Sequence, residues 1–372
     1  MKLLNNISKK LFYFGFFLSI LWDLYHPILG KVFDILGYVF IIISILLRSI
    51  YSKQTFLQNP LDLFWKIPIL LVSIYSSFFY PLISFSVIAG VLSSIFLPIY
   101  FNAELNSDSI YRFVKNLFFF LFCTQLIQIV IYFLFRYNID FGGLIGFNNS
   151  RNEGGDFFRA SGILAEANAI VVTQSILFII LNKIKNNNKI FIIYFISLII
   201  SFSMLGIGIA FIVFIFLQLQ NISKFKFRRI FIFLIILLIL LIIFNQLGYL
   251  QTVYDIYTFR LDSDSNDVSL YLRLFRPLKI PAYELFIPHA YDIENEIVPS
   301  NAYYTGLFFW GFIFVYFIIR IFIYFRKNYL LYLVFLSMLL SYQMFSSLLF
   351  WIFVSFLISN KKNIAFYDQK IY

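Results

Sequence analysis

Long apolar stretches, broken by short polar segments, occupy most of this chain. A helix needs about 20 apolar residues to cross the hydrocarbon core of a bilayer. The stretches therefore predict an all-α polytopic bundle of about twelve membrane-spanning helices. We expect the spans near residues 11–28, 32–47, 67–80, 82–101, 114–135, 162–181, 190–203, 206–219, 230–247, 302–319, 329–341 and 343–358.

Two apolar stretches, 190–219 and 329–358, are longer than one ordinary crossing. We expect each to form two short helices, with breaks at the sequences "SMLG" and "SYQM". A bundle of ten spans, with one long tilted helix over each stretch, is the alternative.

The composition is typical of an integral membrane protein. Hydrophobic residues make up 61% of the chain and charged residues only 13%, whereas a soluble domain is about half apolar and a quarter charged. We therefore expect residues 1–372 to form one integral membrane domain. The net charge of +11 does not indicate nucleic-acid binding, because the cations lie in short clusters between apolar stretches, as membrane insertion requires.

The distribution of charge predicts the orientation. With the N-terminus in the cytoplasm, the inner segments hold 21 of the 29 Lys and Arg residues but only 4 of the 18 Asp and Glu residues. Cytoplasmic loops carry such an excess of cations. We therefore expect both termini to be cytoplasmic, and segments 136–161 and 249–301 to be extracytoplasmic loops.

The two outer loops nevertheless contain seven of the eight remaining cations. Six of the seven are arginines, whereas most inner cations are lysines. The planar guanidinium group binds phosphate or carboxylate through two hydrogen bonds, so the loops predict an anion site at the outer face. The seven cations are Arg136, Arg151, Arg159, Arg260, Arg273, Arg276 and Lys279.

The sequence "RASGILAEANAI" places Arg159, Glu166 and Asn168 at the start of an apolar stretch. An ionisable residue inside a span is a candidate functional residue, because its burial in lipid is unfavourable. The helix begins either at Arg159 or, after "ASG", near Ile163. Two structural alternatives stay open: Glu166 pairs with a neighbouring arginine between helices, or Arg159 only anchors the span at the interface.

This stretch resembles the "R-x-S-G-x-(F/L)-x-E-P-N-x-x-A" signature of the O-antigen polymerase and ligase superfamily, the Wzy-type enzymes. "NDVSLYLRLFRPLKIP" is similar to the family's "D-x-S-x-x-x-R", with Ser269 and Arg273 matching. "PSNAYYTGLFFWGFIF" is similar to its "H-N-x-(Y/F)-(L)-x-x-L-x-x-x-G" stretch at the entry to the next span, with Asn301, Tyr303 and Gly311 matching. The resemblance covers roughly residues 140–325 and implies a GT-C-like fold.

The chain also departs from the family pattern. Ala167 stands where the family often has proline, and Ser300 replaces the usual histidine. "IPHAYDIENE" replaces a glycine-rich motif, and "SMLGIG" lacks the arginine common between the next two spans. The missing histidine favours a polymerase over a ligase.

The resemblance implies that the protein polymerises oligosaccharide repeat units, carried on undecaprenyl pyrophosphate, into O-antigen, capsule or exopolysaccharide. The reaction would take place at the outer face of a bacterial cytoplasmic (inner) membrane, without a cofactor. The expected partners are the lipid-linked oligosaccharide, the bilayer and a chain-length regulator protein. The alternatives are an O-antigen ligase and a non-enzymatic flippase of lipid-linked sugars, although the internal repeats of many transporters are not evident.

The candidate residues divide into three roles. Arg159 and Arg273, with support from Arg276 and Arg151, would stabilise negative charge on the leaving pyrophosphate. Glu166 or His289 would act as the general base. Asn168, Asn301 and Tyr303 would position sugar hydroxyls, although tyrosines are also common at membrane interfaces.

The acidic sequence "DSDSND", which begins at Asp262, half-matches a calcium-binding loop. Asp267 replaces the required glycine, and Arg273 stands where the bidentate glutamate belongs. We therefore expect a solvated acidic loop and no metal site.

Overall fold

The computed structural model describes mainly helical parts of the chain. The described residues are 2–21, 29–51, 60–78, 81–104, 108–135, 160–164, 166–185, 187–220, 302–326, 328–341 and 347–359, with single residues at 137, 139, 141, 254, 344 and 345. Within these ranges the chain forms helices and turns but no strand. The helices are α1 (Lys2–Ile20), α2 (Leu29–Tyr51), α3 (Pro60–Ser77), α4 (Pro81–Glu104), α5 (Asp108–Phe135), α7 (Ala167–Ile184), α8 (Asn188–Ile200), α9 (Met204–Gln220), α14 (Ala302–Trp310), α15 (Phe312–Phe325), α16 (Tyr329–Ser341) and α17 (Leu348–Ser359).

The all-helical prediction is confirmed for the described residues. Three helical segments are long and apolar enough to cross a membrane: Val32–Ile50, Asp108–Phe135 and Ala167–Ile184. Six further apolar segments of 10–17 residues accompany them. The chain therefore has the helices of a membrane protein, and the predicted span 230–247 lies outside the described residues.

Both predicted helix breaks are present. α8 ends at Ile200 and α9 begins at Met204, while α16 ends at Ser341 and α17 begins at Leu348. The predicted span 302–319 differs, because α14 and α15 are separated at Gly311, which has φ 56° and ψ −135°. Residues with a side chain rarely adopt this backbone conformation, so glycine permits a break that an apolar count does not detect.

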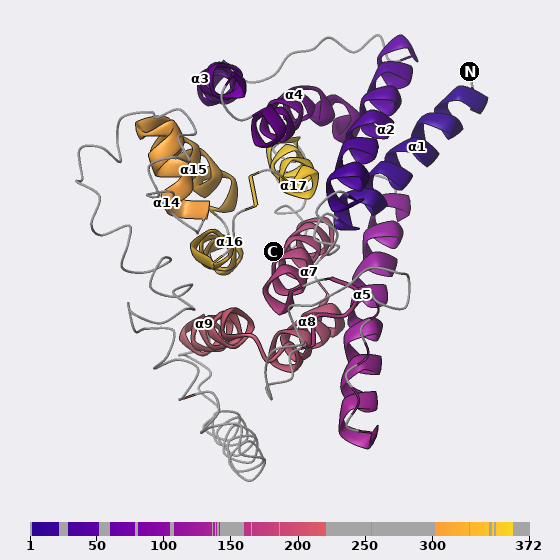
Figure 1. The fold of residues 1–372 in the computed structure, drawn as a ribbon, viewed down its shortest axis with the longest axis vertical. Helices are drawn as coiled ribbons and strands as arrows, with labels where there is room; N and C mark the ends of the chain where they lie inside the picture. The colour runs from indigo at the N-terminus through magenta and orange to yellow at the C-terminus, as the bar shows by residue number, and fades with distance from the viewer. Residues whose placement is uncertain are drawn as a thin grey trace, which may run out of the picture.

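The centre of the bundle contains α7 and α17. Every residue of α17 is buried, as are most residues of α7. In Figure 1 these two helices lie in the middle, with α3 and α4, α14 to α16, α8 and α9, and α1, α2 and α5 around them. A helix that is apolar on all sides is typical of such a buried position.

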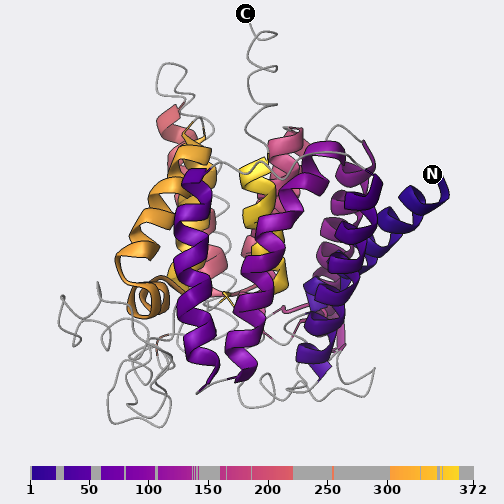
Figure 2. The ribbon, with the colours of Figure 1, turned by 90° about the horizontal axis from the view of Figure 1, so that it is seen from above.

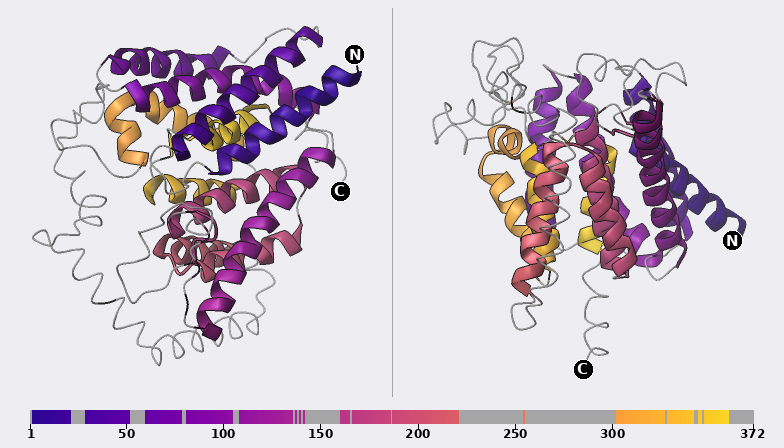
Figure 3. Two further views of the ribbon diagram at one scale, coloured as in Figure 1. Left: turned by 45° about the vertical axis from the view of Figure 1, so that its right-hand side comes forward. Right: turned by 90° about the horizontal axis from the view of Figure 1, so that it is seen from below.

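The outer helices present apolar side chains outward. Ile50 of α2, Leu71 of α3 and Leu134 of α5 are 77%, 60% and 70% exposed. Seen from above, α3 and α4 run side by side (Figure 2), while α5 runs past α7 and α8 at one edge (Figure 3). Polar side chains buried between helices, together with apolar side chains outside, are expected when lipid is the solvent.

The contact between α4 and α17 depends on a glycine. A Cβ atom added at Gly90 would lie 2.0 Å from Cδ1 of Trp351. Trp351 is 1% exposed, and its indole N–H donates a hydrogen bond to the carbonyl oxygen of Phe345 at 2.7 Å. The ring therefore has little freedom to move away.

We predict that Gly90→Ala lowers the stability of the bundle by about 1–3 kcal/mol, because the added methyl group overpacks a rigid contact. The measurement is thermal unfolding in lipid nanodiscs. Gly208→Ala on α9 is the matched control, since a Cβ atom there would meet nothing within 4 Å. Equal melting temperatures for the two variants would contradict the predicted close contact.

Candidate functional site

A buried turn precedes α7 and contains the Ser-Gly pair of the "RASG" sequence. The N–H of Leu164 donates to the carbonyl oxygen of Ser161 at 3.2 Å and closes the turn. Gly162 has φ +60°, and a Cβ atom at this residue would lie 2.6 Å from Oγ1 of Thr124. Both the backbone conformation and the close approach of α5 therefore require glycine at this position.

Two glutamines of α5 bind the backbone of this turn. Oε1 of Gln128 accepts from the N–H of Gly162 at 2.9 Å, and Nε2 of Gln125 donates to the carbonyl oxygen of Ala160 at 3.3 Å. Each glutamine is 1% exposed. Because an unpaired backbone group in an apolar environment costs several kcal/mol, these amides stabilise an interruption in the helical structure.

A third glutamine connects the turn to α7. Nε2 of Gln174 donates to Oε1 of Gln125 at 2.8 Å, and Nε2 of Gln128 donates to the carbonyl oxygen of Ile139 at 3.0 Å. We call Gln125, Gln128 and Gln174 the glutamine cluster. It links α5, the turn and α7, and so fixes the position at which α7 begins.

Glu166 lies at the N-terminal end of α7 and not inside the helix. It is the N-cap residue, with φ −126° and ψ 142°, and its side chain makes no capping hydrogen bond. Its carbonyl oxygen accepts from the N–H groups of Ala169 and Ile170 at 3.1 and 3.3 Å. Both predicted helix starts, Arg159 and Ile163, are therefore too early, because α7 begins only at Ala167, after the turn closed by Ser161 and Leu164.

Asn168 contacts the segment between α8 and α9. Its Oδ1 accepts from Oγ of Ser203 at 2.9 Å, and the same Oγ accepts from the N–H of Gly206 at 3.1 Å. Phe202 in this segment has a positive φ of 49°, an uncommon conformation for a bulky residue. Asn168 therefore joins helices here, and a role in sugar binding stays a prediction.

The structure places only part of the predicted site. Glu166 and Asn168 are two residues apart at the start of α7, and Tyr303 lies in the first turn of α14. The remaining candidates lie outside the described residues; they are Arg151, Arg159, Arg273, Arg276, His289 and Asn301. Asp262 and Asp267 of the acidic loop lie outside them as well.

The glutamine cluster was missed by the sequence interpretation, although a signal was available. Gln125 and Gln128 are three residues apart in an apolar stretch, so they lie on the same face of a helix. Gln174 is likewise a polar residue within the next long apolar stretch. Amides buried in adjacent spans indicate either contacts between helices or partners in broken backbone.

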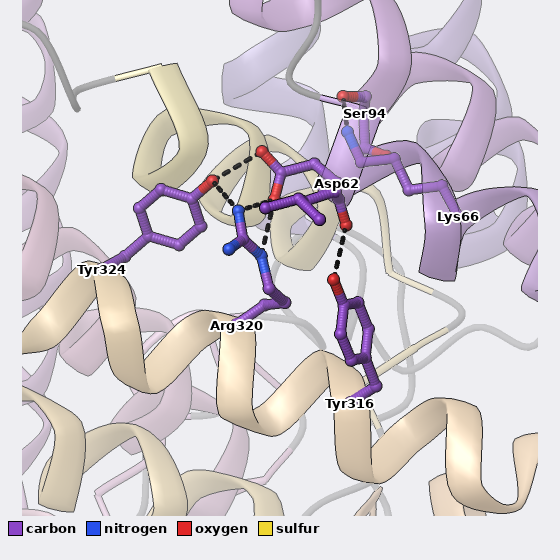
Figure 4. Close-up of polar contacts among 7 residues, drawn as sticks. Asp62, Lys66, Ser94, Tyr316, Arg320 and Tyr324 are labelled. Atoms are coloured by element: carbon purple, nitrogen blue, oxygen red, sulfur yellow. Dashed lines mark hydrogen bonds and ion pairs between the residues drawn. The ribbon is translucent and has the colours of Figure 1, made fainter.

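A second buried polar cluster connects α3, α4 and α15, as Figure 4 shows. Oδ1 of Asp62 accepts from Nε and Nη2 of Arg320 at 3.1 and 2.8 Å. The hydroxyl of Tyr324 donates to Oδ2 at 2.6 Å. Asp62 is 0% exposed and Arg320 is 5% exposed, so this ion pair lies inside the bundle.

Lys66 completes this cluster. This residue lies within α3 and is 0% exposed. Its Nζ donates to the carbonyl oxygen of Ser94 at 2.6 Å. Pro98 follows four residues later in α4 and has no N–H to donate to that carbonyl. Lys66 therefore supplies the hydrogen bond that Pro98 removes.

No protein-family model, curated protein or solved structure matches this chain. The described residues therefore define its class only as a helical protein with helices suited to crossing a membrane.

We predict that Gln128→Met lowers stability by about 1–3 kcal/mol, because the buried N–H of Gly162 and carbonyl of Ile139 lose their partner. Methionine has nearly the same length as glutamine, so the expected loss of stability comes from the missing hydrogen bonds and not from lost packing. Ile127→Met is the matched control, since Ile127 is the neighbouring residue on α5 and is 46% exposed; we expect it to change stability by less than about 0.5 kcal/mol. Unfolding in nanodiscs measures both. A Gln128→Met variant as stable as its control would show that the turn does not need the amide.

Proposed function

We propose that this protein is a Wzy-type polymerase, which joins lipid-linked oligosaccharide repeat units at the outer face of a bacterial cytoplasmic membrane. Twelve spans of a GT-C-like bundle, with both termini in the cytoplasm, would place segments 136–161 and 249–301 on that face. The product would be O-antigen, capsule or exopolysaccharide, and a chain-length regulator protein is a proposed partner.

The observation that carries the proposal is the turn at residues 160–164. Its sequence is part of the stretch that resembles the family signature. Its Gly162 adopts a backbone conformation that favours glycine. The glutamine cluster fixes the turn against α5 and α7. Arg159 directly precedes the turn in the sequence, and Glu166 follows it as the N-cap residue of α7. A rigid support for the groups that flank it is what a catalytic site needs.

The proposed reaction forms one glycosidic bond and breaks one sugar–phosphate bond. A hydroxyl oxygen of one repeat unit attacks the anomeric carbon of the growing chain. The bond to the pyrophosphate breaks, and undecaprenyl pyrophosphate leaves with the bonding electrons. The hydroxyl proton passes to a base, for which Glu166 and His289 are the candidates.

Charge that develops on the leaving pyrophosphate is the main electrostatic requirement. We assign its stabilisation to Arg159 and Arg273, with Arg151 and Arg276 in support, because guanidinium groups bind phosphate oxygens through paired hydrogen bonds. The N-terminus of α7, next to Glu166, is the positive end of the helix dipole and would add to the stabilisation of this negative charge. Asn168, Asn301 and Tyr303 would orient sugar hydroxyls.

A flippase of the same lipid-linked sugars is the second candidate function. The buried cluster of Asp62, Lys66 and Arg320 favours it, because ionisable groups inside a membrane bundle often mark a transport pathway. The Asp62–Arg320 pair also connects α3 with α15, which is a structural role that a polymerase can use equally well.

The experiment that separates these functions is an analysis of lipid-linked products in a strain that lacks the protein. A polymerase predicts accumulation of single repeat units that have reached the outer leaflet. Units confined to the cytoplasmic leaflet would indicate a flippase, and long polymer without an acceptor would indicate a ligase. Either of the last two results would overturn the proposal.

We predict that Arg159→Lys lowers the rate of polymerisation by on the order of 100-fold, because lysine keeps the charge but loses the paired donors. Chain-length distribution and membrane-inserted protein are measured together. Arg136→Lys, in the same predicted outer segment, is the matched control and should leave the chains long. Normal chains in Arg159→Lys would remove Arg159 from the site.

A further inference from the structure

Asp34 of α2 is a carboxylate inside the bundle that lacks a cation. It is 7% exposed and lies within the apolar segment Val32–Ile50. Among the residues that the structure describes, no lysine, arginine or histidine pairs with it, whereas the buried Asp62 pairs with Arg320. A charge buried in an apolar environment is unfavourable unless it is paired or binds a metal ion. The carboxylate of Asp34 therefore needs a further partner.

The start of α17 compensates part of the charge on Asp34. Oδ1 of Asp34 accepts from the N–H of Leu348, the first residue of α17, at 3.2 Å. The N-terminus of a helix carries about half a positive charge, which favours an ionised acceptor. Tyr38 adds no hydrogen bond to the carboxylate, because its hydroxyl donates to the carbonyl oxygen of Ser86 at 2.9 Å. Roughly half of the negative charge is therefore left without compensation, and Oδ2 has no hydrogen-bond partner among the described residues.

The interruption between α16 and α17 provides oxygen atoms next to this contact. Ser347 directly precedes Leu348 and is 2% exposed, yet its Oγ has no hydrogen-bond partner in the described part of the chain. The carbonyl oxygen of Met344 accepts from the N–H of Ser347 at 3.0 Å. The carbonyl oxygen of Phe345 accepts from the indole N–H of Trp351 at 2.7 Å. A carbonyl oxygen has two lone pairs, so each can also bind a cation, as carbonyl oxygens of unwound helices do for Na⁺ in transporters.

We propose that Asp34 and the start of α17 form a binding site for Na⁺. Oδ2 of Asp34 supplies the negative charge, and Oγ of Ser347 supplies a neutral oxygen ligand. The carbonyl oxygens of Met344 and Phe345 are the further ligands. The bound ion neutralises the buried carboxylate and holds α2 against α17, the fully buried helix at the centre of the bundle.

The charge and the packing favour a small monovalent ion. One carboxylate beside the positive end of a helix does not balance a divalent ion. Within the described ranges, no group of three or more His, Cys, Asp or Glu side chains could hold a metal ion. The two helices also lie close together, since a Cβ atom at Gly37 would lie 2.9 Å from Cδ2 of Leu348. Such close packing is unsuited to a bulky organic cation.

The Na⁺ site is independent of the chemistry proposed for the outer loops. In the proposed topology both α2 and α17 begin at the outer face, so the ion would enter from that side. None of its ligands belongs to the groups assigned to the pyrophosphate, the sugars or the base. Binding can therefore be measured on protein that has no substrate present.

The first test compares thermal unfolding of the full chain in phosphatidylcholine nanodiscs in NaCl and in choline chloride, each at about 0.15 M. We expect a melting temperature at least about 3 °C higher in NaCl, rising with the Na⁺ concentration, because the ion binds only the folded protein. Equal melting temperatures in the two salts would overturn the site. Stabilisation by acid in choline chloride, without a response to Na⁺, would assign a proton to Asp34 and would also overturn it.

Asp34→Asn separates Na⁺ binding from simple capping of α17. Asparagine keeps an oxygen for the N–H of Leu348 and removes the charge. We expect this variant to lose the response to Na⁺ and, in choline chloride, to melt no lower than the wild type, because it buries no bare carboxylate. An Asp34→Asn variant that melts below the wild type in both salts, or that keeps the response to Na⁺, would contradict the proposal.

Ser347→Ala tests the second ligand. It should raise the Na⁺ concentration needed for half of the stabilisation at least about fivefold, because the ion loses an oxygen. Ser355→Ala is the matched control on α17, since the hydroxyl of Ser355 donates to the carbonyl oxygen of Trp351 within the helix. Equilibrium binding of radioactive Na⁺ to wild-type protein gives an answer even where a variant fails to fold. Saturable binding supports the site, and its absence, or equal effects of the two serine variants, would refute it.

Discussion

The hydrogen bonds that an interrupted helix leaves unmade are the constraint on which this structure depends. Inside a helix every backbone N–H and carbonyl is paired, but a turn or a proline exposes groups that lipid cannot satisfy. At the turn before α7, Gln125 and Gln128 bind the exposed backbone. In α4, Lys66 binds the carbonyl that Pro98 leaves without a donor. Gln125, Gln128 and Lys66 therefore lie where the backbone hydrogen bonds of a helix are interrupted.

This arrangement connects the fold with the proposed chemistry. A continuous helix through "RASGILAEANAI" would carry Glu166 into the span, where its charge would be unfavourable. The turn at Gly162 instead delays the start of α7 until Ala167, so Glu166 lies at the helix end. The glutamine cluster binds the turn that leads to this end, and a fixed support is what the proposed base and its neighbouring arginine need.

The sequence predicted the class of fold and many of the helix positions, because apolar length and charge distribution are strong signals in membrane proteins. The breaks at "SMLG" and "SYQM" were recognised from length alone. The break at Gly311 was not, since a single glycine inside an apolar stretch leaves the hydropathy unchanged. The predicted start of α7 was also wrong by several residues, because the turn before α7 is bound by Gln125 and Gln128 of α5, which lie more than 30 residues away in the sequence.

The candidate site was predictable only in part. Local spacing identified Glu166 and Asn168, but the partners that support them come from α5 and from the segment between α8 and α9. Contacts between distant segments do not follow from periodicity. The pairing of Asp62 with Arg320, 258 residues apart, is a second example, because each residue alone had the position of an inner-loop charge.

The most direct test of the proposed site is a cryo-electron microscopy structure of the full chain in nanodiscs with undecaprenyl pyrophosphate bound. The account predicts that guanidinium groups of Arg159 and Arg273 lie within about 3 Å of phosphate oxygens, beside the N-terminus of α7. A pyrophosphate bound elsewhere, with these two arginines apart and directed into open water, would contradict it.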